Sequence, residues 1–183
     1  MNNQLTPVSW QTVFKKSLIW GIWLFFLAIL QTTLFSHIRI FGAVPDLILP
    51  AVVAVAVYDK ERTGTIAGIV GGVLIDALGG VGLSISPLVY MICGTFVALM
   101  TYSVLRRDFI SWLTGTAASL IITGGFSVLS ARVALGASRF ASSDIWSELL
   151  IPQYFASLIM GVPVWFFTRL IWSKWFDNRE MEG

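Results

Sequence analysis

The run SLIWGIWLFFLAILQTTLF, residues 17–35, contains no charged side chain and is long enough to cross a membrane as one helix. At about 1.5 Å per residue, a helix needs about 20 residues to span the ~30 Å hydrocarbon core of a bilayer. Lys15 and Lys16 precede the run, just as basic residues precede the apolar region of a secretory signal peptide. A cleavable signal has an apolar region of only about 7–15 residues that ends at small side chains, and this run is longer. We therefore expect a retained first helix with a cytoplasmic N-terminus.

The rest of the chain has the same apolar character. Of the 183 residues, 56% are hydrophobic and 12% are charged, whereas about a quarter of the residues of a soluble domain are charged. The mean hydropathy is +0.81. This composition predicts a single all-α integral membrane domain over residues 1–183, with residues 1–14 and 174–183 as cytoplasmic tails. The net charge of +2 gives no reason to expect binding to nucleic acid, and the single Cys93 excludes a disulfide within the chain.

Six apolar segments predict a polytopic bundle of about six transmembrane helices. They cover residues 17–35, 44–58, 64–78, 84–105, 109–131 and 151–173. The second and third are short, since a helix of that length reaches only about 22 Å. Each of them either completes the crossing with its flanks or belongs to a re-entrant hairpin that protein shelters from lipid. Both alternatives keep the two termini on the same side of the membrane.

The basic residues set the expected orientation, because Lys and Arg favour the cytoplasmic side. Six crossings place nine of them inside: Lys15, Lys16, Lys60, Arg62, Arg106, Arg107, Arg169, Lys174 and Arg179. The three outside are Arg39, Arg132 and Arg139. This bias predicts that both termini are cytoplasmic.

Two surface features follow from this orientation. An aromatic belt is expected at the cytoplasmic headgroups, formed by Trp20, Trp112, Trp172 and Trp175. Between Arg132 and Leu150, two acidic residues lie four positions apart and apolar side chains fill another sector of the helical projection, which favours a short helix on the outer membrane surface. The acidic residues are Asp144 and Glu148. A partner-binding helix is the alternative interpretation of this stretch.

Two carboxylates, Asp46 and Asp76, lie at or near the hydrocarbon, where an ionisable side chain needs a partner or water. Asp46 follows Pro45 at the start of its segment, so it is placed to cap the first helical turn. Asp76 is at the wrong end of its segment for capping. It is expected to bind backbone N–H groups of the following turn, a basic group or a partner protein, and a ligand or proton site is the remaining alternative. The glycines of that turn are Gly79, Gly80 and Gly82. Since a lost cap costs only about 1 kcal/mol, we expect Asp76→Ala to damage folding or assembly more than Asp46→Ala.

A strip of small residues runs along the third segment, where Gly64, Gly68 and Gly72 recur every four positions. Such a face lets two helices approach closely. The neighbouring helix belongs either to this chain, which we favour, or to another protein.

The sequence shows no recognisable catalytic or metal-binding motif. His37 is the only histidine, and no HExxH, GxSxG or CxxC spacing occurs. Asp46 and Asp76 supply the two membrane carboxylates that an intramembrane aspartyl protease needs, but neither lies in a catalytic motif. We therefore expect a protein that is not an enzyme and that needs no metal or cofactor.

Two stretches of the chain resemble the MreD family of rod-shape-determining membrane proteins. One is Pro45-Asp46-Leu47-Ile48-Leu49, and the other is GIVGGVLIDALGG at residues 68–80. That family opens one helix with Pro-Asp-Leu-Leu and closes the next with a Gly-Leu-Leu-Leu-Asp-like sequence. The resemblance is best over residues 44–95. This chain has Val81-Gly82-Leu83 where a Pro-Leu-Gly turn is common in the family.

The resemblance implies a non-enzymatic scaffold of the bacterial cell-elongation complex in the cytoplasmic membrane, which supports cell shape and lateral peptidoglycan synthesis. Its implied partners are MreC, the filament protein MreB, the glycosyltransferase RodA, a class B penicillin-binding transpeptidase and membrane lipid. The family is also similar in fold to the substrate-binding S components of energy-coupling-factor vitamin transporters. An S component is therefore the alternative function, and it would need a polar, partly aromatic pocket into which Asp46, Asp76, His37 and Arg132 converge.

Overall fold

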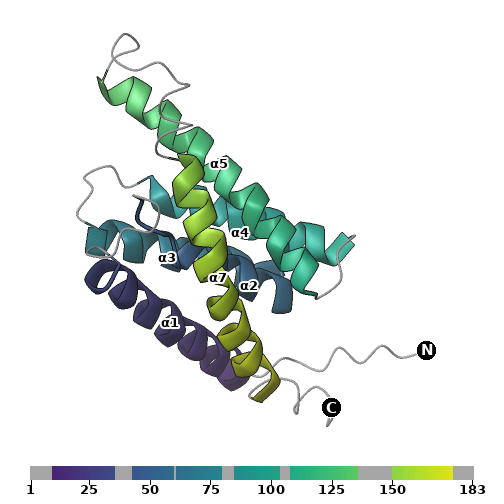
Figure 1. Ribbon diagram of the computed structural model, residues 1–183. Coiled ribbons are helices and arrows are strands. Elements are labelled where there is room, and N and C mark those ends of the chain that lie inside the picture. Colours follow the sequence, from purple (N-terminus) through teal and green to yellow (C-terminus); the bar gives the residue numbers. More distant parts are fainter. Residues whose placement is uncertain are drawn as a thin grey trace.

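The computed structural model describes residues 10–35, 43–59, 61–79, 85–103, 108–135 and 150–174. Six α-helices account for nearly all of these residues (Figure 1). They are α1 (Trp10–Thr33), α2 (Ile48–Tyr58), α3 (Glu61–Gly79), α4 (Ser86–Ser103), α5 (Phe109–Leu135) and α7 (Ile151–Trp172). The predicted all-α class is therefore confirmed for the described residues. The first helix starts earlier than expected, at Trp10, inside the segment predicted to be a tail.

Three of the helices are long and apolar enough to cross a membrane: α1 from Phe14 to Thr33, α5 from Phe109 to Ser130, and α7 throughout. These are the features of a helical membrane protein. The other three contribute shorter apolar stretches, which are Ile48–Tyr58, Thr63–Leu78 and Ser86–Thr101. The expected count of six full spans is therefore not supported, because the apolar stretches of α2, α3 and α4 are shorter than those of the three candidate spans.

Helices that follow one another in the chain run in opposite directions, and the start of α1 lies at the same end of the bundle as the end of α7 (Figure 1). At this end the Lys16 ammonium lies 5.2 Å from the centre of the Trp172 ring. The same ammonium lies 3.7 Å from the carboxylate of Asp59, which follows the last turn of α2. At the opposite end, Gln31 near the end of α1 accepts a hydrogen bond of 2.9 Å from the Leu47 N–H just before α2.

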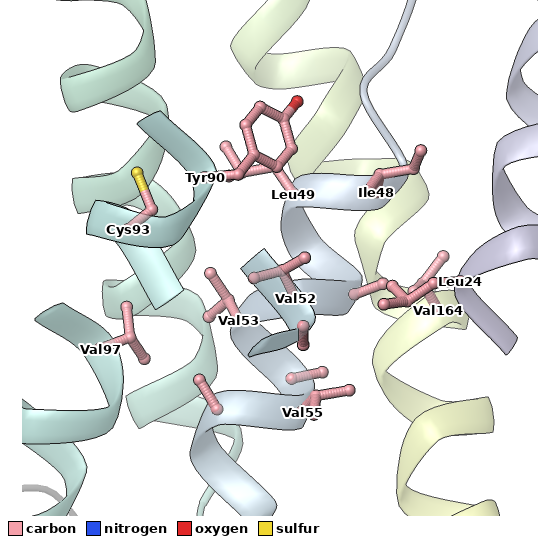
Figure 2. Packing of buried hydrophobic residues seen from close by; sticks show 14 of the residues in the cluster. Leu24, Ile48, Leu49, Val52, Val53, Val55, Tyr90, Cys93, Val97 and Val164 are labelled. Carbon is pink, nitrogen blue, oxygen red and sulfur yellow. The ribbon is translucent and has the colours of Figure 1, made fainter. Parts of the chain in front are cut away.

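The centre of the bundle is α2, whose residues are all buried. Its sequence ILPAVVAVAVY is apolar on every side, and such a helix belongs inside a protein or a membrane. It contacts each of the other five helices. Figure 2 shows its side chains, including Val52 and Val53, among Val97 of α4, Val164 of α7 and Leu24 of α1. The other helices separate α2 from lipid. A helix sheltered in this way does not have to cross the whole hydrocarbon core.

The glycine strip of α3 packs against α4 of the same chain. A Cβ atom at Gly68 would lie 2.9 Å from the Cα atom of Met91, and one at Gly72 would lie 2.7 Å from the carbonyl carbon of Ser86. Gly94 of α4 lies opposite Gly64, where an added Cβ atom would meet the Gly94 carbonyl oxygen at 3.1 Å. The two backbones thus approach so closely that any side chain between them would collide with main-chain atoms.

The expected aromatic belt is wrong for three of its four residues. Trp20, Trp112 and Trp172 are only 2%, 0% and 8% exposed, so they lie inside the bundle rather than at its lipid-facing surface. Two of them have polar partners for their N–H groups within the protein: the Trp112 indole donates to the Pro50 carbonyl at 3.0 Å, and the Trp20 indole donates to Asp59 at 3.3 Å. The fourth, Trp175, and the proposed surface helix, within residues 136–149, lie outside the described residues.

Replacing Asp59 with Ala is expected to loosen α1 from α2. Asp59 is 8% exposed and receives both the Trp20 hydrogen bond and the Lys16 ion pair. Loss of these contacts should lower the free energy of unfolding by about 1.5 kcal/mol, the lower end for hydrogen bonds to a charged group. Thermal unfolding in mild detergent measures the effect. Asp108→Asn, at an exposed position, serves as the control and should leave the melting temperature unchanged.

Candidate functional site

A cavity of about 280 Å³ lies between the first half of α4, the second half of α5 and the start of α7. Asp46, from the connection between α1 and α2, reaches the same cavity. The lining combines apolar side chains with polar ones, of which the main ones are Asp46, Ser86, Tyr90, Thr123, Ser127 and Gln153. This cavity is the candidate site because it joins a partly buried carboxylate to several hydroxyl groups.

Asp46 caps α2, as its position after Pro45 predicts. Its Oδ1 atom accepts hydrogen bonds from the backbone N–H groups of Ile48 at 3.0 Å and of Leu49 at 3.2 Å. Its other oxygen, Oδ2, accepts a hydrogen bond from the Tyr90 hydroxyl of α4. A single carboxylate thus fixes the start of α2 and ties it to a second helix.

Two further contacts make this place a junction of four helices. The backbone N–H of Asp46 donates to the Ser157 hydroxyl of α7 at 2.8 Å. The Gln31 side chain of α1 accepts from the Leu47 N–H at 2.9 Å and from the Ile48 N–H at 3.3 Å. The first orphan N–H groups of α2 are therefore all paired with side chains, which a helix end inside an apolar bundle requires.

The electrostatic setting of Asp46 follows from its burial. Removal from water raises the pKa of its carboxyl group, which lies before α2 and outside the three candidate spans. The hydrogen bonds from Tyr90 and from the backbone of Leu49 and Ile48 act in the opposite direction, because they favour the charged form. Positive charge placed in the cavity would favour the ionised carboxylate further.

Asp76 lies apart from this junction, in the last turns of α3, and is half-buried. Its Oδ2 atom is buried and has no hydrogen-bond partner among the described residues. Of the turn glycines expected to bind it, Gly79 is the last residue of α3, and Gly80 and Gly82 lie outside the described residues.

The four residues that the alternative function, an S component, would bring together in a ligand pocket do not all meet. Asp46 lines the cavity, whereas Asp76 and Arg132 are not part of its lining, and His37 lies outside the described residues. The sequence analysis missed Tyr90, Gln31 and Ser157, which complete the junction. A usable signal was present, because polar side chains inside apolar segments commonly hydrogen-bond across helices.

The described residues contain no group of three or more His, Cys, Asp or Glu side chains that would hold a metal ion. The cavity offers hydroxyl and amide groups for hydrogen bonding beside one carboxylate. No protein-family model matches the chain, and comparisons with curated proteins and with solved structures find no match.

Proposed function

We propose that the chain is a non-enzymatic membrane scaffold of the bacterial cell-elongation complex, similar to the MreD family. In this role it binds MreC and, within one complex, MreB, RodA and a class B penicillin-binding transpeptidase. Three spanning helices, with the shorter α2, α3 and α4 packed among them, form the proposed platform, and the family resemblance implies a fold similar to that of the S components.

The observation that supports this proposal best is the contact between the two stretches that carry the family resemblance. A Cβ atom at Gly71 would lie 2.9 Å from Cγ2 atoms of both Ile48 and Val52, so the stretch after Pro45 and the glycine-rich stretch pack face to face. Asp46 serves as the hydrogen-bonded junction of the helices. On this proposal, the family-like residues hold the helices of the scaffold in a fixed arrangement to which partner proteins bind.

The distribution of basic residues supports a cytoplasmic position for both termini in the bacterial inner membrane. Lys16 and Arg169 lie toward the end of the bundle where α1 begins and α7 finishes, and Arg132 is in the last turn of α5, at the other end. Because Lys and Arg favour the cytoplasmic side, we propose that the end with Lys16 and Arg169 faces the cytoplasm.

Partner contacts belong on surfaces that the fold leaves open. The glycine face of α3 is occupied by α4, which removes it from the candidate partner surfaces. The outer turn after Asp76 and the stretch before Ile151 stay as the proposed contact regions, and the exposed apolar faces of α1 and α7 face lipid.

Affinity purification of the tagged full chain from its native bacterium in mild detergent, followed by mass spectrometry, tests the proposal. We expect enrichment of MreC, RodA and the class B transpeptidase over an unrelated multi-span membrane protein purified in parallel. A preparation that instead contains a coupling membrane subunit with paired ATPases would contradict the scaffold and favour vitamin uptake.

The S component is the second candidate, and the cavity is the observation that favours it. A volume of about 280 Å³ lined by hydroxyl groups, aromatic rings and Asp46 matches the kind of pocket that such a component needs. The absence of Asp76 and Arg132 from this lining weakens the case, so the scaffold is our first choice.

A further inference from the structure

Three hydroxyl side chains of α5 present acceptor lone pairs to the cavity. The Thr123 hydroxyl donates to the Leu120 carbonyl at 2.9 Å, Ser127 donates to the Thr123 carbonyl at 2.9 Å, and Ser130 donates to the Ser127 carbonyl at 3.0 Å. A hydroxyl has one proton and two lone pairs. Because each proton is used on the backbone of α5, the hydroxyl oxygens of these lining residues are left to accept hydrogen bonds from a ligand.

Tyr90 and Asp46 add to these acceptors, whereas Gln153 also lines the cavity and carries both an acceptor oxygen and amide N–H donors. The Tyr90 hydroxyl uses its proton on Asp46, whose carboxylate is an acceptor only. The rings of Phe126 and Tyr154 also line the cavity, and aromatic faces attract cations. The lining residues that the structure describes include no Lys, Arg or His. The exposed Arg132 lies beyond Ser130 on α5 and does not line the cavity.

We infer that this cavity binds a primary ammonium group. Such a group carries one positive charge and three N–H donors with no acceptor, which complements a carboxylate surrounded by hydroxyl lone pairs. An anionic ligand would instead place a like charge beside Asp46. The cavity, at about 280 Å³, lies just below the size range of drug-sized pockets, so it suits a small amine or a single headgroup.

The ammonium group has two chemical sources in a membrane. One is a free amine in solution, and the other is the headgroup of an aminophospholipid. Lining residues Ile85 and Ser127 are exposed, so the cavity reaches the surface of the bundle and either source can enter.

The test uses the full chain in phosphatidylcholine nanodiscs. The headgroup of this lipid carries a quaternary ammonium without N–H donors, so the lipid itself does not supply the proposed ligand. Titration with ethanolamine and with its neutral counterpart ethylene glycol is followed by calorimetry, with empty nanodiscs as the blank. We expect ethanolamine to bind at least tenfold more tightly than ethylene glycol. With phosphatidylethanolamine added to the discs, a weaker apparent affinity for ethanolamine identifies the lipid headgroup as a competing occupant, and an unchanged affinity identifies the free amine.

Three variants locate the binding. Asp46→Asn keeps an acceptor for the α2 cap but removes the charge, and we expect it to weaken ethanolamine binding at least tenfold. Ser127→Leu fills the cavity from an exposed helical position and should abolish binding without touching the junction. Asp108→Asn removes an exposed carboxylate elsewhere and should change nothing.

Equal affinity for ethanolamine and ethylene glycol would overturn the inference. So would ethanolamine binding that survives both Asp46→Asn and Ser127→Leu, or a folded wild-type chain that does not bind ethanolamine. The inference does not rest on the elongation scaffold: that proposal is decided by the proteins that co-purify, and this one by the charge of the bound probe.

Discussion

Gly68→Leu is expected to force α3 away from α4 and to cause the largest loss of stability of any single substitution considered for this bundle. A Cβ atom at this position would lie 2.7 Å from the carbonyl carbon of Tyr90 and 2.9 Å from the Cα atom of Met91. Main-chain atoms cannot rotate away as the end of a side chain can. Overpacking typically costs about 1–3 kcal/mol, and the further atoms of leucine should bring the loss to the upper end or beyond. Thermal unfolding and the yield of monodisperse protein measure it.

Gly125→Ala is the matched control. Gly125 is also inside a long helix, but beyond the adjacent backbone of its own helix no heavy atom lies within 4 Å of the place where its Cβ atom would be. Alanine in a helix interior is about 0.5–1 kcal/mol more favourable than glycine, so this variant should melt at the same or a higher temperature. If Gly68→Leu melts like Gly125→Ala, the close approach of α3 and α4 is disproved.

Asp46→Ala should have the second largest effect, because it removes the carboxylate at the four-helix junction. The loss of the cap costs about 1 kcal/mol, and the buried Tyr90 hydroxyl loses its acceptor, which costs about 1–3 kcal/mol. Together these terms predict a destabilisation of about 2–4 kcal/mol. Adding Tyr90→Phe to the alanine variant should restore part of it, since removing both partners of a hydrogen bond is milder than removing one.

Asp76→Ala is the comparison for this prediction. The buried Oδ2 atom of Asp76 has no hydrogen-bond partner in the described part of the chain, so alanine there should cost less stability than at Asp46. This order is the reverse of the one expected from sequence. A lower melting temperature for Asp76→Ala than for Asp46→Ala would show that the junction is not the stronger anchor.

The sequence predicted the features that depend on neighbours along the chain. Apolar runs gave the all-α class and the approximate helices, the position of Asp46 after Pro45 gave the cap, and four-residue spacing gave the glycine face. Each of these follows from the period of a helix or from the chemistry of its first turn.

The sequence did not reveal features that depend on which helices meet. A tryptophan near the end of an apolar segment fits a lipid-facing belt as well as it fits a buried position. Only the packing shows that the Trp112 indole donates a hydrogen bond to the Pro50 carbonyl inside the bundle. The cavity likewise arises from α4, α5 and α7 together with Asp46, which are distant in sequence. The greater weight given to Asp76 rested on treating Asp46 as a helix cap alone, whereas the Asp46 carboxylate also accepts a hydrogen bond from Tyr90 of α4.

The complete burial of α2 has a consequence for how the chain enters the membrane. With 11 residues it is about 16 Å long, roughly half the thickness of the hydrocarbon core. A newly made segment of this length cannot hold itself across the bilayer, so its insertion depends on helices synthesised before and after it. We therefore expect α2 to stay at the insertion machinery until α3 has emerged, and biogenesis to be most vulnerable at this step.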